Sequence, residues 1–475
     1  MDTPNVLLVV LDSVRAKNTS LHGHGNETTP FLESFADEAE VYEQARAPSI
    51  HSVSSHASIF TGHHVPEHNV TKHESELDPT STIWHELATD HGYETGIFTP
   101  NVVVGVSSNL IDPFDTVDGP RQDPGHRYFE GGISPSDVEG HQTKREYLER
   151  CLDSTAPLKS IVNGLYFEYY DGGDADVDES ATAYIDSFFE WTDARSGPWA
   201  ACLNLMDAHY PYEPAAEFDR WGDDELQAVH DGLPAPPSRE IATDGNWWKL
   251  RAIESLYDGC IRQVDAAMEH LVGELRERGA LDDTLLVITS DHGEGFGERS
   301  LITPSVRIAD HSWGVHEVQT HVPLVVRHPG GGDGTVEDRL ASLTRFPDVV
   351  RSELAGERGS FAVDDHAVAM TYRLEQPERV LPSACPDRES YGGPWRAVYR
   401  QDGDRVRKDA DHGTDARTEV IESAQVSSPR GDGDVEFLNE VYGDFQDAGV
   451  RGRSADDASL DDDVEQQLEE LGYLR

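Results

Sequence analysis

The sequence is poor in cysteine, and its few cysteines lie far apart. The 475 residues include only Cys151, Cys202, Cys260 and Cys385, and none of these forms a C-x-x-C pair. Disulfide frameworks and cysteine-based zinc sites have characteristic short spacings between cysteines. The spacing therefore argues against a disulfide-stapled fold and against a zinc cluster, and it predicts buried, reduced thiols.

Basic residues are also scarce. The chain has 38 Lys and Arg against 90 Asp and Glu, which gives a formal net charge of −52. A field of this sign repels nucleic acid and anionic membrane surfaces, so neither is expected as a partner. The acids are spread over the whole chain, and its apolar periodicity argues against disorder. The composition thus predicts a folded protein with a solvated acidic surface of the halophilic kind.

Long apolar runs are missing as well. No stretch approaches the ~20 apolar residues that a membrane-spanning helix needs. The N-terminus passes from "MDTP" directly into "NVLLVVLD", without the basic segment of a secretory signal peptide. We therefore expect no membrane span and a cytoplasmic location.

The chain does contain continuous apolar runs that end in an acid. They are "NVLLVVLD" (5–12), "WAACLNLMDAH" (199–209) and "DDTLLVITSDHGE" (282–294). Such runs indicate strands that are buried on both faces, as in parallel sheets. Helical patterns alternate with them, the longest over residues 256–280. The order predicts an α/β sandwich with a large, mostly parallel central sheet flanked by helices.

The pattern changes after about Gly359. "AVAMTYRLE" (367–375) and "WRAVYRQDGDRV" (395–406) alternate between apolar and polar residues, which indicates a small antiparallel sheet. Residues 409–434 are predicted to be a polar linker, and "DDDVEQQLEELGYLR" (461–475) a closing helix. We expect a catalytic domain over residues 1–360 and a C-terminal subdomain over residues 361–475.

Acids stand at the ends of three predicted strands: Asp12, Asp207 and Asp291. In open α/β sheets, ligands bind at the carboxyl ends of the strands. Asp291 is followed by His292, and both residue types bind divalent metals. Acids that meet at one edge would repel each other without a cation. The pattern favours a metal site, and the alternative is a set of capping acids with a surface histidine.

Histidines and serines supply further candidates. "MDAHYPY" (206–212) holds His209 in a turn, where it could bind an anion or belong to an aromatic surface cluster. "ADHSWGVHEVQTHVPL" (309–324) offers His311 and His316. In "SIHSVSSHASIFTG" (49–62), serines 52 to 55 span the predicted start of a helix. A serine there could cap the helix, or become a nucleophile if a metal lowers its pKa.

Taken together, these segments resemble the sulfatase family of the alkaline phosphatase superfamily, in particular its acidic haloarchaeal members. The resemblance extends over nearly the whole chain. It implies one divalent cation, Ca²⁺ or Mn²⁺, bound by Asp12, Asp291 and His292. It is carried by "PNVLLVVLDSVRAKNTSLHGHG", "TTPFLESFA", "SSHASIFTGHHVPEHNV", "LNLMDAHYPYEP", "LLVITSDHGEGFGE", "THVPLVVRHPG" and "LEELGYL".

The resemblance also implies roles for individual residues. The nucleophile is Ser52, ten residues before the glycine of "SIFTG", which leaves Ser55 as the helix cap. His209 and His311 are the expected catalytic histidines, which contact the transferred group or protonate the leaving group. The expected substrate-binding residues are His56, Asp207 and His316.

The chain departs from the family pattern at two places. Ser13 stands where many members have a second aspartate. Ser54 and His56 stand where sulfatases have the Pro and Arg needed to oxidise the nucleophile to formylglycine. The hydrate of formylglycine is a geminal diol, which can expel sulfate as it collapses. A sulfate ester of plain serine has no such route and hydrolyses slowly, whereas a serine phosphate is an ordinary covalent intermediate.

The function expected from the sequence is metal-dependent hydrolysis of sulfate esters on a small molecule or glycan. One alternative is hydrolysis of phosphomonoesters, phosphodiesters or phosphonates, or transfer of a phospho group, by an unmodified Ser52. A third possibility is a catalytically degenerate member that binds an anion or glycan.

Overall fold

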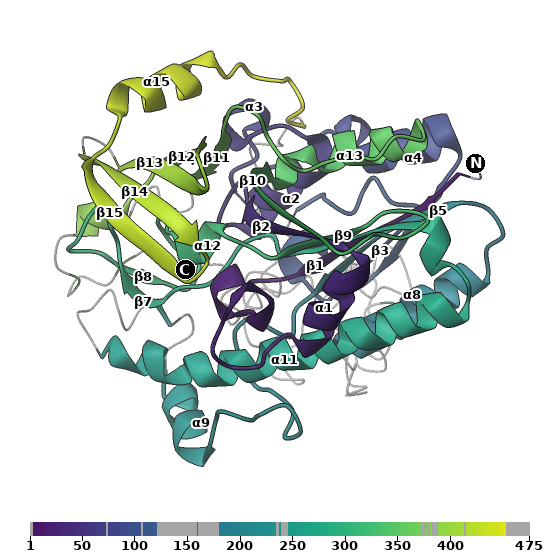
Figure 1. Cartoon of the computed structure of the whole chain (residues 1–475), viewed down its shortest axis with the longest axis horizontal. Coiled ribbons are helices and arrows are strands. Elements are labelled where there is room, and N and C mark those ends of the chain that lie inside the picture. The colour runs from purple at the N-terminus through teal and green to yellow at the C-terminus, as the bar shows by residue number, and fades with distance from the viewer. Residues whose placement is uncertain are drawn as a thin grey trace.

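A large mixed sheet forms the centre of the computed structural model (Figure 1). The structure describes residues 3–72, 75–105, 108–120, 180–233, 246–372, 388–412 and 415–452, with residues 159, 237–238, 377, 381 and 385 between these ranges. The strand order is β10-β2-β9-β6-β1-β5-β3-β4. The strands are β1 (Asn5–Leu11), β2 (Glu40–Arg46), β3 (Glu94–Phe98), β4 (Thr116–Asp118), β5 (Trp199–Leu205), β6 (Thr284–Thr289), β9 (Leu324–Arg327) and β10 (Thr335–Ser342).

Most neighbouring strands in this sheet are parallel. β1 pairs in parallel with β5 and β6, and β3 pairs in parallel with β4 and β5. β9 runs antiparallel to β2 and β6, because the chain leaves β6 and re-enters the sheet from the same edge. The loop of residues 290–323, which includes α12 (Glu317–Thr320), therefore lies at the carboxyl edge of the parallel strands. The predicted α/β fold class is confirmed.

Helices cover both faces of the sheet. Residues Leu7, Val9 and Leu11 of β1 belong to one buried cluster, and the residues between them belong to another. This alternation, with both faces covered, explains the unbroken apolar run of the strand. None of the described helices carries an apolar run long enough to cross a bilayer. The helices are α1 (Pro30–Phe35), α8 (Ala181–Asp193) and α11 (Trp248–Glu277) on one face, and α2 (Ser52–Thr61), α4 (Ile83–His91) and α13 (Phe346–Leu354) on the other (Figure 1).

A separate antiparallel sheet follows in the chain, with the strand order β11-β12-β13-β14-β15. The prediction of a linker over residues 409–434 is wrong, because strands occupy most of that range. The outer strand β15 is mostly exposed and polar, so its pairing with β14 left no apolar alternation to read. The predicted closing helix lies outside the described residues. The elements are β11 (Ala367–Thr371), β12 (Trp395–Asp402), β13 (Arg405–His412), β14 (Asp415–Ser423), β15 (Val426–Asp432) and α15 (Val435–Asp444).

A buried ion-pair cluster joins the small sheet to the carboxyl edge of the large one. Lys408 of β13 donates from Nζ to the main-chain oxygen of Val315 at 2.5 Å, and Nζ lies 3.1 Å from Oε1 of Glu317. Arg46, at the end of β2, lies 3.1 Å from Oε2 of the same glutamate. Glu419 of β14 is 3.8 Å from Nζ. The cluster therefore fixes the loop before β9 against the small sheet.

We predict that Lys408→Met destabilises the protein by about 3–5 kcal/mol, because it removes the buried cation beside Glu419 and leaves Glu317 with Arg46 as its counter-charge. Urea unfolding followed by circular dichroism measures the loss. Arg405→Met on the same strand removes a 44% exposed side chain paired with Glu422, and should cost less than about 1 kcal/mol. Equal losses in the two variants would contradict a special role for the cluster.

Candidate active site

The three residues predicted to bind a metal lie together at the carboxyl edge of the sheet. β1 and β6 pair in parallel with Val10 opposite Thr289, so Asp12 and Asp291 leave the sheet at the same level. Together with His292 they are fully buried. One ligand atom from each of the three lies within 4.8 Å of the others. The pairing of β1 with β6 thus brings ligand atoms from two distant sequence segments close together.

The surroundings of these donors fit a divalent cation. His292 donates from Nδ1 to the main-chain oxygen of Gly293 at 3.1 Å, which leaves the lone pair on Nε2, as in many metal-binding histidines. Oδ2 of Asp291 is buried and has no hydrogen-bond partner. Burial raises the pKa of Asp291, against the opposing charge of His56. A cation would offset the cost of burying this carboxylate, and oxygen and imidazole donors suit Ca²⁺ or Mn²⁺.

Two asparagines that sequence reasoning missed orient Asp12. Asn101 and Asn204 donate from Nδ2 to Oδ2 of Asp12 at 2.8 and 3.2 Å. Ser13, the residue at the position of a family aspartate, donates from Oγ to Oδ1 at 3.0 Å. The available signal was a single polar residue, Asn204, inside the apolar run of β5. Both carboxylate oxygens of Asp12 therefore accept hydrogen bonds from side chains.

Ser52 begins α2 directly beside the donor set. It is fully buried, and its Oγ lies 3.2 Å from Nε2 of His292. The prediction that Ser55 caps the helix is wrong: His51 is the cap, accepting from the main-chain nitrogen of Val53 at 3.2 Å. Ser55 instead donates from Oγ to the main-chain oxygen of Asp291 at 2.6 Å. The helix N-terminus at Ser52 favours an anionic group there.

Three predicted histidines surround this serine and the donor set. His56 donates from Nδ1 to the main-chain oxygen of Ser52 at 2.8 Å, and Nδ1 is 3.7 Å from Oδ2 of Asp291. The His311 ring lies 4.5 Å from the His292 ring and 5.3 Å from the His209 ring, measured between centroids. The structure therefore gathers Ser52, His56, His209 and His311 around the predicted metal ligands.

Asp207 lies just beyond the end of β5, as predicted, and its described partners belong to two helices. Its Oδ2 accepts from the main-chain nitrogen of Ala181 at 2.9 Å, and its Oδ1 accepts from Nε2 of Gln263 at 2.8 Å. The carboxylate thus ties the start of α8 to α11. These contacts stabilise the fold, and the expected role of Asp207 in substrate binding stays a prediction.

His316 also lies apart from the serine. It caps α12, where Nδ1 accepts from the main-chain nitrogen of Val318 at 3.3 Å. Burial lowers the pKa of His316 to about 4, and the charge of Lys408 acts in the same direction. The described contacts place it in the buried cluster between the two sheets, and they do not join it to Ser52 or His292.

A fully buried glutamate, which sequence reasoning overlooked, contacts one of the histidines. Oε2 of Glu294 lies 3.3 Å from Nδ1 of His311. Burial raises the pKa of Glu294 well above its usual value, and the charge of Asp310 adds to the effect. The available signal in the sequence was an acid between Gly293 and Gly295, two residues after His292.

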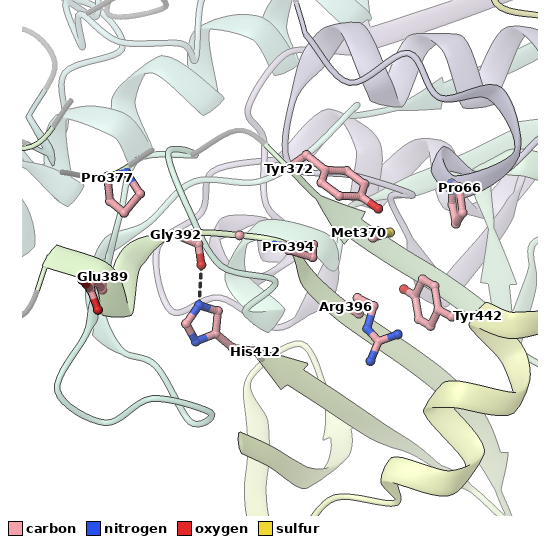
Figure 2. Close-up of a pocket in the computed structure, with 11 residues that line it drawn as sticks. Pro66, Met370, Tyr372, Pro377, Glu389, Gly392, Pro394, Arg396, His412 and Tyr442 are labelled. Carbon is pink, nitrogen blue, oxygen red and sulfur yellow. Dashed lines mark hydrogen bonds between the residues drawn. The ribbon is translucent and has the colours of Figure 1, made fainter. Parts of the chain in front are cut away.

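A cavity of about 820 Å³ opens at the small sheet, away from these residues. Figure 2 shows Tyr372, Arg396, His412 and Tyr442 among its lining residues. Arg396 is already paired with Asp411, with Nε donating at 2.9 Å. None of the residues predicted for the site lines this cavity. The predicted metal ligands and Ser52 therefore lie in a buried cluster and not at this cavity.

The buried donor set lies within the part of the chain that one protein-family model matches. Residues 4–350 match the family model for sulfatases. The chain belongs to the sulfatase family. Its catalytic class is accordingly that of hydrolases acting on ester bonds.

Individual relatives are distant. The chain is 21% identical over 407 residues to a multifunctional alkaline phosphatase superfamily protein of Trinickia caryophylli, covering 75% of each chain. It is 23% identical over 372 residues to an arylsulfatase of Clostridium perfringens, covering 72% of each. A phosphonate monoester hydrolase of Agrobacterium radiobacter has a similar fold, with a TM-score of 0.58 at 18% identity, over 88% of this chain and 89% of that one.

We predict that Asp291→Asn abolishes metal-induced stabilisation without harming the metal-free fold. The amide is nearly isosteric but removes the buried charge that a cation would compensate. Thermal unfolding with chelator and with excess Mn²⁺ tests this. The unmodified protein should melt several degrees higher with metal, and the variant should not respond. A variant that still gains stability from Mn²⁺ would contradict the assigned ligand.

Proposed function

We propose that the protein hydrolyses sulfate esters of small molecules or glycans in a metal-dependent reaction with Ser52 as the nucleophile. The observation that carries this is the 3.2 Å separation of the Ser52 hydroxyl from His292, beside the buried donor set at a helix N-terminus. Family membership supports the sulfate ester as substrate.

Asp12, Asp291 and His292 are the residues proposed to hold one divalent cation. A bound cation supplies positive charge that lowers the pKa of a nearby hydroxyl and stabilises anionic oxygens. Ser52 loses its proton to water and attacks the sulfur or phosphorus atom with its oxygen. The bond from that atom to the ester oxygen breaks as His311 gives this oxygen a proton.

His209 and His56 complete the proposed anion site. His209 is held by a 2.7 Å contact between its Nδ1 and the main-chain oxygen of Tyr210, and its ring packs near His311. His56 has a buried Nε2 without a hydrogen-bond partner. As an imidazolium, the ring can donate from this nitrogen to a group with anionic oxygens. Water then releases the group from Ser52, and the serine regains its proton.

Phosphate or phosphonate esters are the second candidate substrates, and a specific feature favours them. Ser54 and His56 replace the residues that direct oxidation of the nucleophile. His56 instead bonds the main chain of Ser52, so its position supports a serine nucleophile. An unmodified serine forms an ordinary phosphoryl intermediate, whereas its sulfate ester is released slowly.

We predict that Ser52→Ala lowers turnover of aryl sulfate or aryl phosphate esters at least about 10³-fold, because no covalent intermediate can form. Metal binding should persist, since the ligands are intact. Ser58→Ala, on the same helix with its hydroxyl bonded to His68 at 2.9 Å, should keep activity within a few-fold. Metal-dependent turnover that survives in Ser52→Ala would contradict the proposed nucleophile.

The halophilic and cytoplasmic character of the protein is also a proposal. The net charge of −52 supports the first, and the buried free thiols Cys202 and Cys260 support the second.

We predict that raising KCl from about 0.1 M to about 2 M increases the melting temperature, because the Debye length falls from ~10 Å to below ~3 Å and screens the self-repulsion of the acidic surface. Differential scanning calorimetry measures the shift. A melting temperature that is unchanged or falls with salt would contradict a halophilic surface.

A further inference from the structure

Glu294 and His311 face each other through the register of a short hairpin. β7 (Phe296–Arg299) and β8 (Arg307–Ala309) are antiparallel, with Phe296 opposite Ala309. Beyond the strands, Gly295 and Asp310 exchange both main-chain hydrogen bonds, at 3.0 and 2.8 Å. The next pair in the same register is Glu294 and His311. Side chains of such a non-hydrogen-bonded pair approach closely.

Several contacts hold the glutamate in this place. Oε1 accepts from the main-chain nitrogen of Gly295 at 3.1 Å, and Oε2 lies 3.3 Å from Nδ1 of His311. Arg15 donates to the main-chain oxygen of Glu294 at 2.8 Å. These contacts hold Glu294 through both carboxyl oxygens and through its main chain.

The neighbouring glycines make this close packing possible. A Cβ atom at Gly293 would lie 2.1 Å from the main-chain oxygen of Val318, and one at Gly295 would lie 2.7 Å from Cγ2 of Ile308. Larger residues would push the hairpin away from the metal ligands. The glycine–glutamate–glycine sequence thus sets the distance between the metal ligands and His311.

We propose that Glu294 is a positioning residue for His311, binding Nδ1 so that Nε2 carries the proton given to the leaving oxygen. This inference rests on the proposed function. The balance is simple: the ester bond breaks, the leaving oxygen takes the proton from Nε2, and His311 recovers a proton from water. The shared proton between Nδ1 and the carboxyl group stays within the pair. A histidine that can rotate would lose this alignment.

The test compares two esters that differ in leaving group, 4-nitrophenyl and phenyl, with Glu294→Leu and Glu294→Gln. 4-Nitrophenolate is a good leaving group that departs without being protonated. Phenolate is a poorer one, and its departure is faster when a proton is donated to its oxygen. Glu294→Leu should lower kcat for the phenyl ester by about 10²-fold or more and for the nitrophenyl ester by much less, with KM little changed. Glu294→Gln, whose amide oxygen can still accept from Nδ1, should recover part of the loss.

A double-mutant cycle separates positioning from a general structural effect. In the His311→Gln background, Glu294→Leu should change kcat by less than about two-fold. Asp265→Asn is the matched control and should leave both rates unchanged. It replaces another buried acid, whose hydrogen bonds among the described residues go to the main chain of α1. Equal losses for both esters, or a full further loss in the His311→Gln background, would overturn the proposal.

Nitrogen-15 NMR of histidine-labelled, unmutated protein provides evidence that needs no variant at position 294. The expected signature for His311 is a protonated Nε2 with a hydrogen-bonded Nδ1; a ring with an unengaged Nδ1 would overturn the inference. If the unmutated protein shows no metal-dependent turnover, the proposed function fails. If turnover depends on Ser52 but not on Glu294, only the positioning role fails.

Discussion

The arrangement of the site depends on two carboxylates that the sheet forces together in a buried place. Asp12 and Asp291 leave adjacent parallel strands at the same level, so their charges meet without water. Asn101 and Asn204 satisfy the first carboxylate, while one oxygen of the second has no hydrogen-bond partner. A cation at this point would explain why the fold tolerates both acids, and it places the charge beside the start of α2.

The return of the chain from β6 to β9 supplies the rest of the proposed machinery. The loop between these strands begins with the proposed metal ligands Asp291 and His292. It continues through the hairpin that places Glu294 opposite His311, and it ends in α12. Lys408 and Arg46 hold Glu317 of that helix in the buried cluster between the two sheets. The small sheet thus stabilises the catalytic loop from outside, although it contributes no residue to the serine and metal cluster described here.

The sequence predicted the parts of this structure that follow from local chemistry. Buried parallel strands are continuous apolar runs, and the acids after them predicted the donor set of Asp12, Asp291 and His292. The edge strand β15 was misread as part of a linker, because the pairing of an edge strand is set by its neighbour and not by its own pattern. Ser55 was predicted from its place at the start of a helix and Asp207 from its place at the end of a strand, whereas the contacts of both include distant segments. His316 caps α12 through a local contact that its residue type did not reveal. Glu294 became visible only through the register of the hairpin.

The central claim is that an unmodified Ser52 forms the covalent intermediate. The seryl and formylglycine routes differ in how the group leaves the enzyme, and the residues around Ser52 favour a plain hydroxyl. The most direct measurement is mass spectrometry of the peptide spanning residues 46–70 after acid quenching during turnover. The account predicts a serine at position 52 that carries a phosphoryl or sulfuryl group, absent when metal is removed. Formylglycine at this position, or an adduct on a different residue, would contradict it.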